Sequence, residues 1–188
     1  RPFDAERTGL NLGEAVATMI YSIECPKKAC WQLTAGSMHN DANHISGPSR
    51  TGEGSYRCLV DVLLHCDTAD INALSVHGTA TPYNDEMEAI AIHRAHMQEV
   101  PILAFTGYYG HTMGAAGVLE TILTMLALEN GTLIGNPRYE ACGTSYALNI
   151  TKEHRSLGKL PMHFIKIMSG FGGCNAAIRL SYCGCDEL

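Results

Sequence analysis

Short apolar runs and longer segments with apolar residues at helical spacing alternate along this chain. The short runs are bounded by glycine, proline and other turn residues, which is typical of buried strands. They predict strands within residues 14–24, 31–36, 71–77, 100–105, 131–137 and 146–150. Residues 162–182 predict two further strands, joined by a glycine-rich turn at 170–173. The longer segments predict helices within 56–66, 82–98 and 114–130.

This order of elements predicts an α/β fold in which helices cover both faces of a mixed sheet. Apolar residues surround nearly the whole circumference of the helix predicted at 114–130, so we expect that helix to be buried on most sides. In the helix predicted at 82–98, Asp85 stands three residues before Glu88, which is the spacing of a capping box. Residues 36–54 are dense in Asn, Asp, Ser, Gly and Pro, which predicts a long loop.

Composition and charge exclude several classes of protein. The chain has 188 residues, of which 46% are hydrophobic and 17% charged, as in soluble globular proteins. No window approaches the roughly 18 apolar residues of a membrane span. The net charge is −6 and the 13 lysines and arginines are scattered, which argues against a nucleic-acid surface. Because the chain does not begin with methionine, we expect it to be part of a larger cytoplasmic protein.

The eight cysteines do not form a metal-binding or disulfide pattern. Cys25, Cys58 and the other cysteines lack paired CxxC spacing, and the closest pair is Cys183 and Cys185 near the C-terminus. We therefore expect free thiols in a reducing cytoplasm and no metal.

Three glycine-flanked motifs place polar or aromatic residues at the ends of predicted strands. They are "VHGTATPYND", "GYYGHTMGAAG" and "SGFGGCN", and their small residues let a ligand approach the backbone closely. Together they predict a pocket in which His77 and His111 face each other. Neutral imidazoles can donate N–H groups to an oxyanion, and a position at the start of a helix would help to keep His111 neutral. The alternative is two buried histidines that are satisfied by backbone carbonyls.

These motifs also carry a family resemblance. "HGTATPYNDEMEA" (77–89), "GHTMGAAG" (110–117) and "GFGGCNAAI" (170–178) closely resemble the C-terminal signatures of β-ketoacyl-[acyl carrier protein] synthases of the elongating type. The resemblance extends to "RPFDAERTGLNLGEA" (1–15) and "NDANHISGP" (40–48). It implies a thiolase-like fold of two related α/β halves. Residues 1–50 would end the N-terminal half with its last strands, and residues 51–188 would form the C-terminal half, with a mixed five-stranded sheet and helices on both faces.

The resemblance also implies a reaction and its partners. In such enzymes a cysteine of the first half takes the acyl chain as a thioester, and malonyl-carrier protein is decarboxylated and condensed with it. His77 and His111 match the two histidines that assist decarboxylation and stabilise the enolate. Thr79 and Thr81 match threonines that bind the phosphopantetheine arm of the acyl carrier protein.

At the third motif, Phe171 matches a gating phenylalanine, and Gly172 beside it leaves room for that side chain to swing. The resemblance implies a dimer, either a homodimer or a heterodimer with a related synthase subunit. It implies no metal or organic cofactor beyond the arm that the carrier protein brings.

Two features depart from the family pattern. The nucleophilic cysteine is expected before Arg1, so we expect this chain alone not to catalyse condensation, and we interpret Cys142 in "EACGTSYA" as a loop cysteine. The lysine that elongating synthases carry before the histidine of "GHTMGAAG" is replaced by Thr106, so its charge is lost or relocated.

Three functions therefore remain open. The leading one is an acyltransferase of fatty-acid or polyketide synthesis, which the retention of His77 and His111 favours. The second is a non-catalytic partner subunit similar to a chain-length factor, which Thr106 favours. The third is a thiolase, for which Cys174 would have to supply a second reactive thiol.

Overall fold

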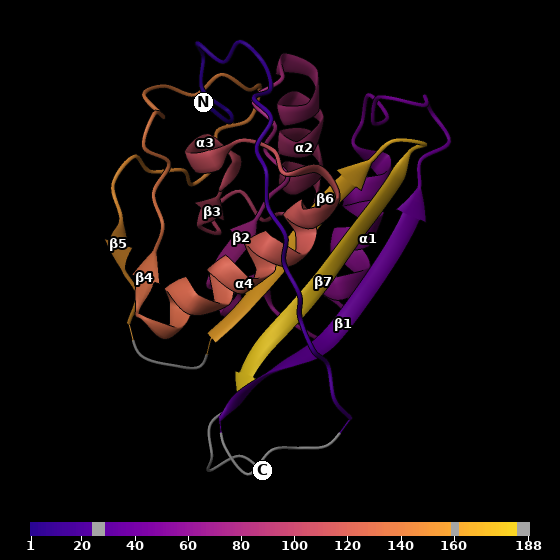
Figure 1. The fold of residues 1–188 in the computed structure, drawn as a ribbon. Helices are drawn as coiled ribbons and strands as arrows, with labels where there is room; N and C mark the ends of the chain where they lie inside the picture. Colours follow the sequence, from indigo (N-terminus) through magenta and orange to yellow (C-terminus); the bar gives the residue numbers. More distant parts are fainter. Residues whose placement is uncertain (24–28, 159–161, 184–188) are drawn as a thin grey trace.

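A five-stranded mixed sheet forms the centre of the molecule in the computed structural model, which describes residues 1–23, 29–158 and 162–183 (Figure 1). The strand order is β1-β7-β6-β2-β3. β1, β7 and β6 pair antiparallel, whereas β2 runs parallel to both β6 and β3. The bounds are β1 Cys30–Asn40, β2 Ala73–Ser75, β3 Ile102–Leu103, β6 Met162–Gly170 and β7 Cys174–Cys183. The predicted mixed sheet and the predicted final hairpin are confirmed.

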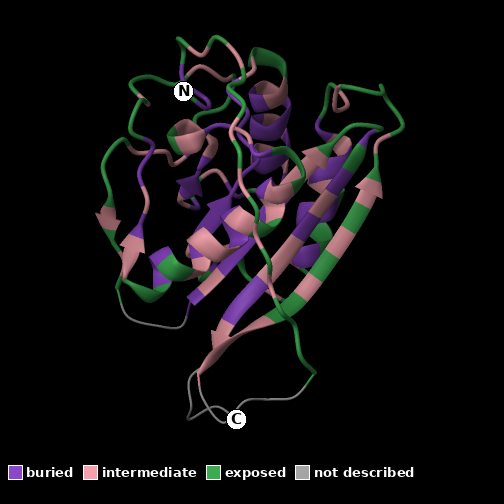
Figure 2. Cartoon of the chain, viewed as in Figure 1, coloured by how far each residue is buried: buried purple, intermediate pink, exposed green. Residues whose placement is uncertain are grey.

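Helices cover both faces of this sheet, as predicted. Because successive strand residues point to opposite faces, neighbouring residues of β6 join different cores. Ile165 packs in one apolar cluster with Leu59 of α1 (Glu53–Val62) and Ile92 of α2 (Pro82–Arg94). Phe164 packs in the other with Leu128 of α4 (Ala116–Glu129). Figure 2 shows the resulting burial along β2 and β6, whereas the edge strand β1 alternates between half-buried and exposed residues.

The helices and two short strands complete the fold. A second, two-stranded sheet pairs β4 with β5 antiparallel. Within the described ranges, no helix is long and apolar enough to cross a membrane. The helix bounds are α1 Glu53–Val62, α2 Pro82–Arg94, α3 Thr106–Tyr109 and α4 Ala116–Glu129, with 3-10 turns η1 Thr68–Asp70 and η2 Met113–Ala115. The short strands are β4 Thr132–Leu133 and β5 Arg155–Ser156.

Two of the predicted strands are wrong. Residues 14–23 join no strand, and Val16 and Ile20 are 93% and 91% exposed; residue 24 lies outside the described part. At 146–150, Asn149 accepts a hydrogen bond from the Ile102 backbone (3.0 Å), but the segment forms no ladder. Apolar residues favour a strand only where a neighbouring edge supplies regular hydrogen-bond partners, and a local pattern cannot specify such an edge.

The sheet also crosses the division predicted at residue 50. β1 lies before that position, and its residues pair with β7 from Cys30↔Cys183 to Asn40↔Cys174. The strand predicted at 31–36 is therefore part of the same sheet as β2, β6 and β7.

The helix predicted at 114–130 forms as η2 and α4, but its burial differs from the prediction. Glu120, Thr121 and Thr124 are buried, whereas Val118 and Leu126 are 37% and 49% exposed. The two threonine hydroxyls donate to carbonyl groups within the helix (2.7 Å each), which satisfies them locally. The buried side of α4 is thus partly polar, and Glu120 on that side contacts β6.

Candidate functional site

His77 lies just beyond the carboxyl end of β2, and its backbone is fixed by a buried carboxylate from α2. Glu88 accepts hydrogen bonds from the backbone N–H of His77 (2.6 Å) and of Gly78 (2.9 Å). Burial raises the pKa of Glu88 to about 7, although these N–H groups act in the opposite direction. Gly78 adopts φ 47°, in the left-handed region that favours glycine.

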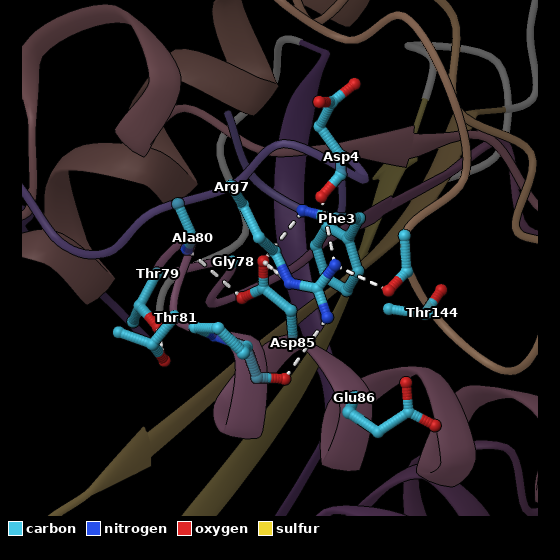
Figure 3. A network of polar contacts seen from close by, with 12 residues as sticks. Phe3, Asp4, Arg7, Gly78, Thr79, Ala80, Thr81, Asp85, Glu86 and Thr144 are labelled. Carbon is cyan, nitrogen blue, oxygen red and sulfur yellow. Dashed lines mark hydrogen bonds and ion pairs between the residues drawn. The ribbon is translucent and has the colours of Figure 1, made fainter.

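Asp85 fixes the next part of this loop in the same way. Its carboxylate accepts the backbone N–H of Phe3 (2.7 Å) and of Ala80 (3.1 Å), and Arg7 Nε lies 3.8 Å away. Figure 3 shows Asp85 and Arg7 together between α2 and the N-terminal segment. Burial raises the pKa of Asp85 to about 6. The predicted capping box is wrong: Asp85 and Glu88 lie within α2 and are buried, and they bind backbone groups of other segments.

His111 is held through its backbone by the N-terminal segment. Its N–H donates to Asn11 O (2.8 Å), and its carbonyl accepts the N–H of Gly13 (2.9 Å). Gly110 has φ 81°, and a Cβ atom there would lie 2.8 Å from the backbone carbon of Leu12. The glycine before the histidine is therefore required by a close crossing of two backbones.

The structure brings the two predicted histidines together. Their ring centroids are 4.9 Å apart, and the rings are nearly perpendicular, at 84°. Burial, together with smaller contributions from nearby Lys166 and His111, lowers the pKa of His77 to about 3. Burial also lowers the pKa of His111, while Glu120 acts to raise it. In both rings Nδ1 is buried without a hydrogen-bond partner among the described residues.

The structure does not support the predicted reason for a neutral His111. Helix α4 begins at Ala116, after the 3-10 turn η2, so His111 does not stand at the start of a helix. The effect of a helix dipole falls off within about the first turn. Desolvation, with a smaller contribution from Lys166, lowers the pKa of His111 and favours the neutral ring instead, although Glu120 acts in the opposite direction.

Both histidines line a cavity of about 810 Å³. Thr79 and Thr81 also line it, and their hydroxyl oxygens lie 2.9 Å apart. Phe171 lies at the turn between β6 and β7 and is 79% exposed. Gly172, which follows it with φ 83°, donates its N–H to Ile45 O (2.7 Å) and does not itself line the cavity.

Sequence reasoning missed two charged residues beside this cavity. Lys166 of β6 donates from Nζ to Val76 O (2.8 Å) and forms a salt bridge with Glu120 of α4. The two side chains are 2% and 0% exposed. The runs "HFIKIM" and "VLETILTML" are mostly apolar, and each contains one lysine or glutamate. Because unpaired charges are rarely buried, this pattern was the signal that could have indicated a buried ion pair. Thr106, in the place of the expected lysine, donates its hydroxyl to Gly78 O.

Five of the described cysteines form no disulfide bond: Cys30, Cys58, Cys66, Cys142 and Cys174. Cys25 and Cys185 lie outside the described residues, within which no cluster of His, Cys, Asp and Glu could hold a metal. Burial raises the pKa of Cys58, whose thiol contacts Asn175 O, so this cysteine is poorly reactive. Cys142 is exposed and lies outside the named strands, as predicted for a loop cysteine.

The comparisons with known proteins identify the family. The family described as "Beta-ketoacyl synthase, C-terminal domain" matches residues 32–140. The chain belongs to the beta-ketoacyl synthase family. This membership confirms the predicted resemblance and decides against the thiolase alternative.

Relatives of this beta-ketoacyl synthase chain include 3-oxoacyl-[acyl-carrier-protein] synthase 2 of Coxiella burnetii. That protein is 31% identical over 96% of this chain and 46% of its own length. The chain thus spans about half the length of the curated relatives it matches.

Solved structures show the same fold. A ketosynthase in complex with its chain length factor, from Xenorhabdus doucetiae, matches with a TM-score of 0.80 and 24% identity, over 97% of this chain and 46% of that one. The structure of a type II polyketide acyl-carrier protein in complex with its ketosynthase also matches, with a TM-score of 0.71 and 23% identity. The match covers 79% of this chain and 38% of the matched one.

Proposed function

We propose that the protein containing this chain is a 3-oxoacyl-carrier-protein synthase that performs a decarboxylative Claisen condensation. The observation that supports this most directly is the facing pair of His77 and His111. Burial keeps both imidazoles neutral, so each can offer an N–H to developing negative charge in a site partly shielded from water. His77 and His111 are then the catalytic residues.

The proposed step uses this pair at the thioester oxygen of the malonyl group. The bond between the malonyl α-carbon and its carboxylate breaks and releases CO₂. The electron pair forms an enolate whose charge develops on the thioester oxygen, where the two N–H groups bind it. The enolate carbon then attacks the carbonyl of an acyl thioester and expels a cysteine thiolate. This cysteine is expected outside the present chain.

The cavity supports a substrate delivered on a long arm. Thr79 and Thr81 place two hydroxyl groups on its wall, where they could bind the amide groups of a phosphopantetheine arm. Phe171 at the rim would act as a gate, with Gly172 providing freedom of movement. The arm belongs to an acyl carrier protein, so the synthase itself needs no metal or organic cofactor.

The proposed assembly is a cytoplasmic dimer, either a homodimer or a heterodimer with a related subunit, in fatty-acid or polyketide synthesis. Complexes of a ketosynthase with a chain length factor and with an acyl-carrier protein are known for proteins of the same fold. The open part of α4, with Val118 and Leu126 exposed, leaves an apolar surface that the rest of the protein could cover.

The test is decarboxylation of malonyl-carrier protein by the full-length protein, measured as release of labelled CO₂. His77→Asn and His111→Asn are each expected to lower the rate by about 10²–10³-fold, the usual effect of removing one oxyanion donor. His96→Asn is the matched control, because His96 is exposed after α2 and does not line the cavity. Equal rates for all three variants would contradict the proposal.

A second function is favoured by one observation, the threonine at position 106. A non-catalytic partner similar to a chain-length factor would not need the lysine that Thr106 replaces. In that case the wild-type protein would release no CO₂, and a related subunit would require it for condensing activity.

A further inference from the structure

Lys166 and Glu120 form a completely buried ion pair in the region between the sheet and α4. A purely stabilising role gives a weak explanation for such a pair, because removing two charges from water often outweighs their mutual attraction. In addition, Glu120 Oε1 is buried without a hydrogen-bond partner among the described residues. A charge pair that is not fully satisfied, close to a cavity, calls for another explanation.

The pair lies directly behind the two histidines. Lys166 Nζ binds the carbonyl of Val76, the residue before His77. Lys166 and Met168 lie on the same face of β6 because alternate strand residues do so, and Met168 lines the cavity. Glu120 extends from α4, the helix that follows His111 and η2. The ammonium group therefore connects β2, β6 and α4 behind the cavity.

Charged residues of two elements act on the imidazoles, and two further elements place titratable groups nearby. Lys166 of β6 favours the neutral form of both rings, and Glu120 of α4 favours the charged form of His111. Glu88 of α2 holds the backbone of His77, and the buried hydroxyl of Tyr109 in α3 is within the field of Glu120. Of these groups, Lys166 is the one positive charge that acts on both rings.

We propose that Lys166 and Glu120 are a positioning pair for His77 and His111, in which β6 supplies the positive charge missing at position 106. Lys166 anchors the end of β2 through Val76 O, and its charge keeps protons off both rings. Glu120 holds the ammonium in place. The effect on turnover rests on the proposed condensing function, whereas the effect on the imidazoles does not.

The test compares the protonation of the two rings in variants of the full-length protein, by NMR of ¹⁵N-labelled histidine. The His77→Asn and His111→Asn variants assign the signals. Lys166→Met alone leaves Glu120 as a buried unpaired charge, which strongly destabilises a fold, so the principal variant is the double Lys166→Met/Glu120→Gln. It retains side-chain volume and removes both charges.

We expect the double variant to protonate His77 at a higher pH than the wild type does, because it lacks the lysine charge. Glu120→Gln alone is expected not to produce this rise. The matched control is Lys152→Met/Glu140→Gln, which removes an exposed ion pair (2.5 Å) and should leave both signals unchanged. If His77 titrates identically in the wild type and the folded double variant, the proposal is overturned.

Decarboxylation of malonyl-carrier protein provides the second readout. We expect at least a tenfold lower rate for the double variant and an unchanged rate for the control, and an unchanged rate for the double variant would overturn the effect on turnover. If the proposed function itself is wrong, the wild type shows no turnover, while the NMR difference persists. The two failures are therefore distinguishable.

Discussion

The neutral state of His77 leads to a prediction about acid stability. In the folded protein burial lowers its pKa to about 3, from an ordinary value of 6.5. Below pH 6.5 the unfolded chain therefore binds a proton that the folded protein does not bind, and the folded state loses stability as the pH falls. His77→Asn removes this titration. The difference in unfolding free energy between wild type and variant should thus change with pH, in favour of the variant in acid.

The size of the change follows from the pKa shift. One pH unit of unequal protonation corresponds to about 1.4 kcal/mol, so between about pH 7.5 and about pH 4.5 the wild type should lose about 2.7 kcal/mol relative to His77→Asn. Glu88 and Asp85 act in the opposite direction, because their pKa values are raised to about 7 and about 6. Their stabilising contribution is present at low pH and is lost as the pH rises. Both proteins retain them, so their effect cancels in the comparison.

Urea-induced unfolding followed by circular dichroism at several pH values measures this difference. The absolute stability of His77→Asn does not matter, because only the change of the difference with pH is interpreted. The contrary result is a difference in unfolding free energy between wild type and His77→Asn that stays constant, within about 0.5 kcal/mol, from about pH 7.5 to about pH 4.5. In that case His77 accepts a proton in the folded protein, and the reasoning about its burial is refuted.

Two further predictions concern packing. Phe164→Ala should lower the free energy of unfolding by about 3–5 kcal/mol, because Phe164 is fully buried. Val60→Ala, at a position that is 39% exposed, should lower it by less than about 1 kcal/mol. Urea unfolding of both variants measures the two losses, and equal losses would contradict the prediction. Gly110→Ala should destabilise the protein and reduce decarboxylation, because its Cβ would lie 2.8 Å from the backbone of the N-terminal segment. Gly114→Ala, where a Cβ meets no atom within 4 Å, should retain the thermal stability of the wild type, and an equal loss in both would show that this crossing is not tight.

Several parts of the fold could be predicted from sequence because their signals are local. The hairpin of β6 and β7 has two strand-forming runs around a glycine-rich turn, and α2 begins at Pro82 beside an obvious loop. The strand predicted at 14–24 failed because apolar composition does not supply a neighbouring strand edge. The capping box failed because Asp85 and Glu88 have the right spacing but bind backbone groups from residues 3 and 77–80.

The sequence by itself determined the alternating elements, and its glycine-rich motifs indicated the pair of histidines and the family. Only the tertiary structure placed the positive charge of Lys166 against Glu120 and against the backbone that leads into His77. Lys166 lies 46 residues from Glu120 and 90 residues from Val76 in the chain, and they meet only when β6 packs between β2 and β7 and beneath α4. Periodicity reports which face of an element is apolar, but the partner of a buried charge is determined by contacts that close over such long separations.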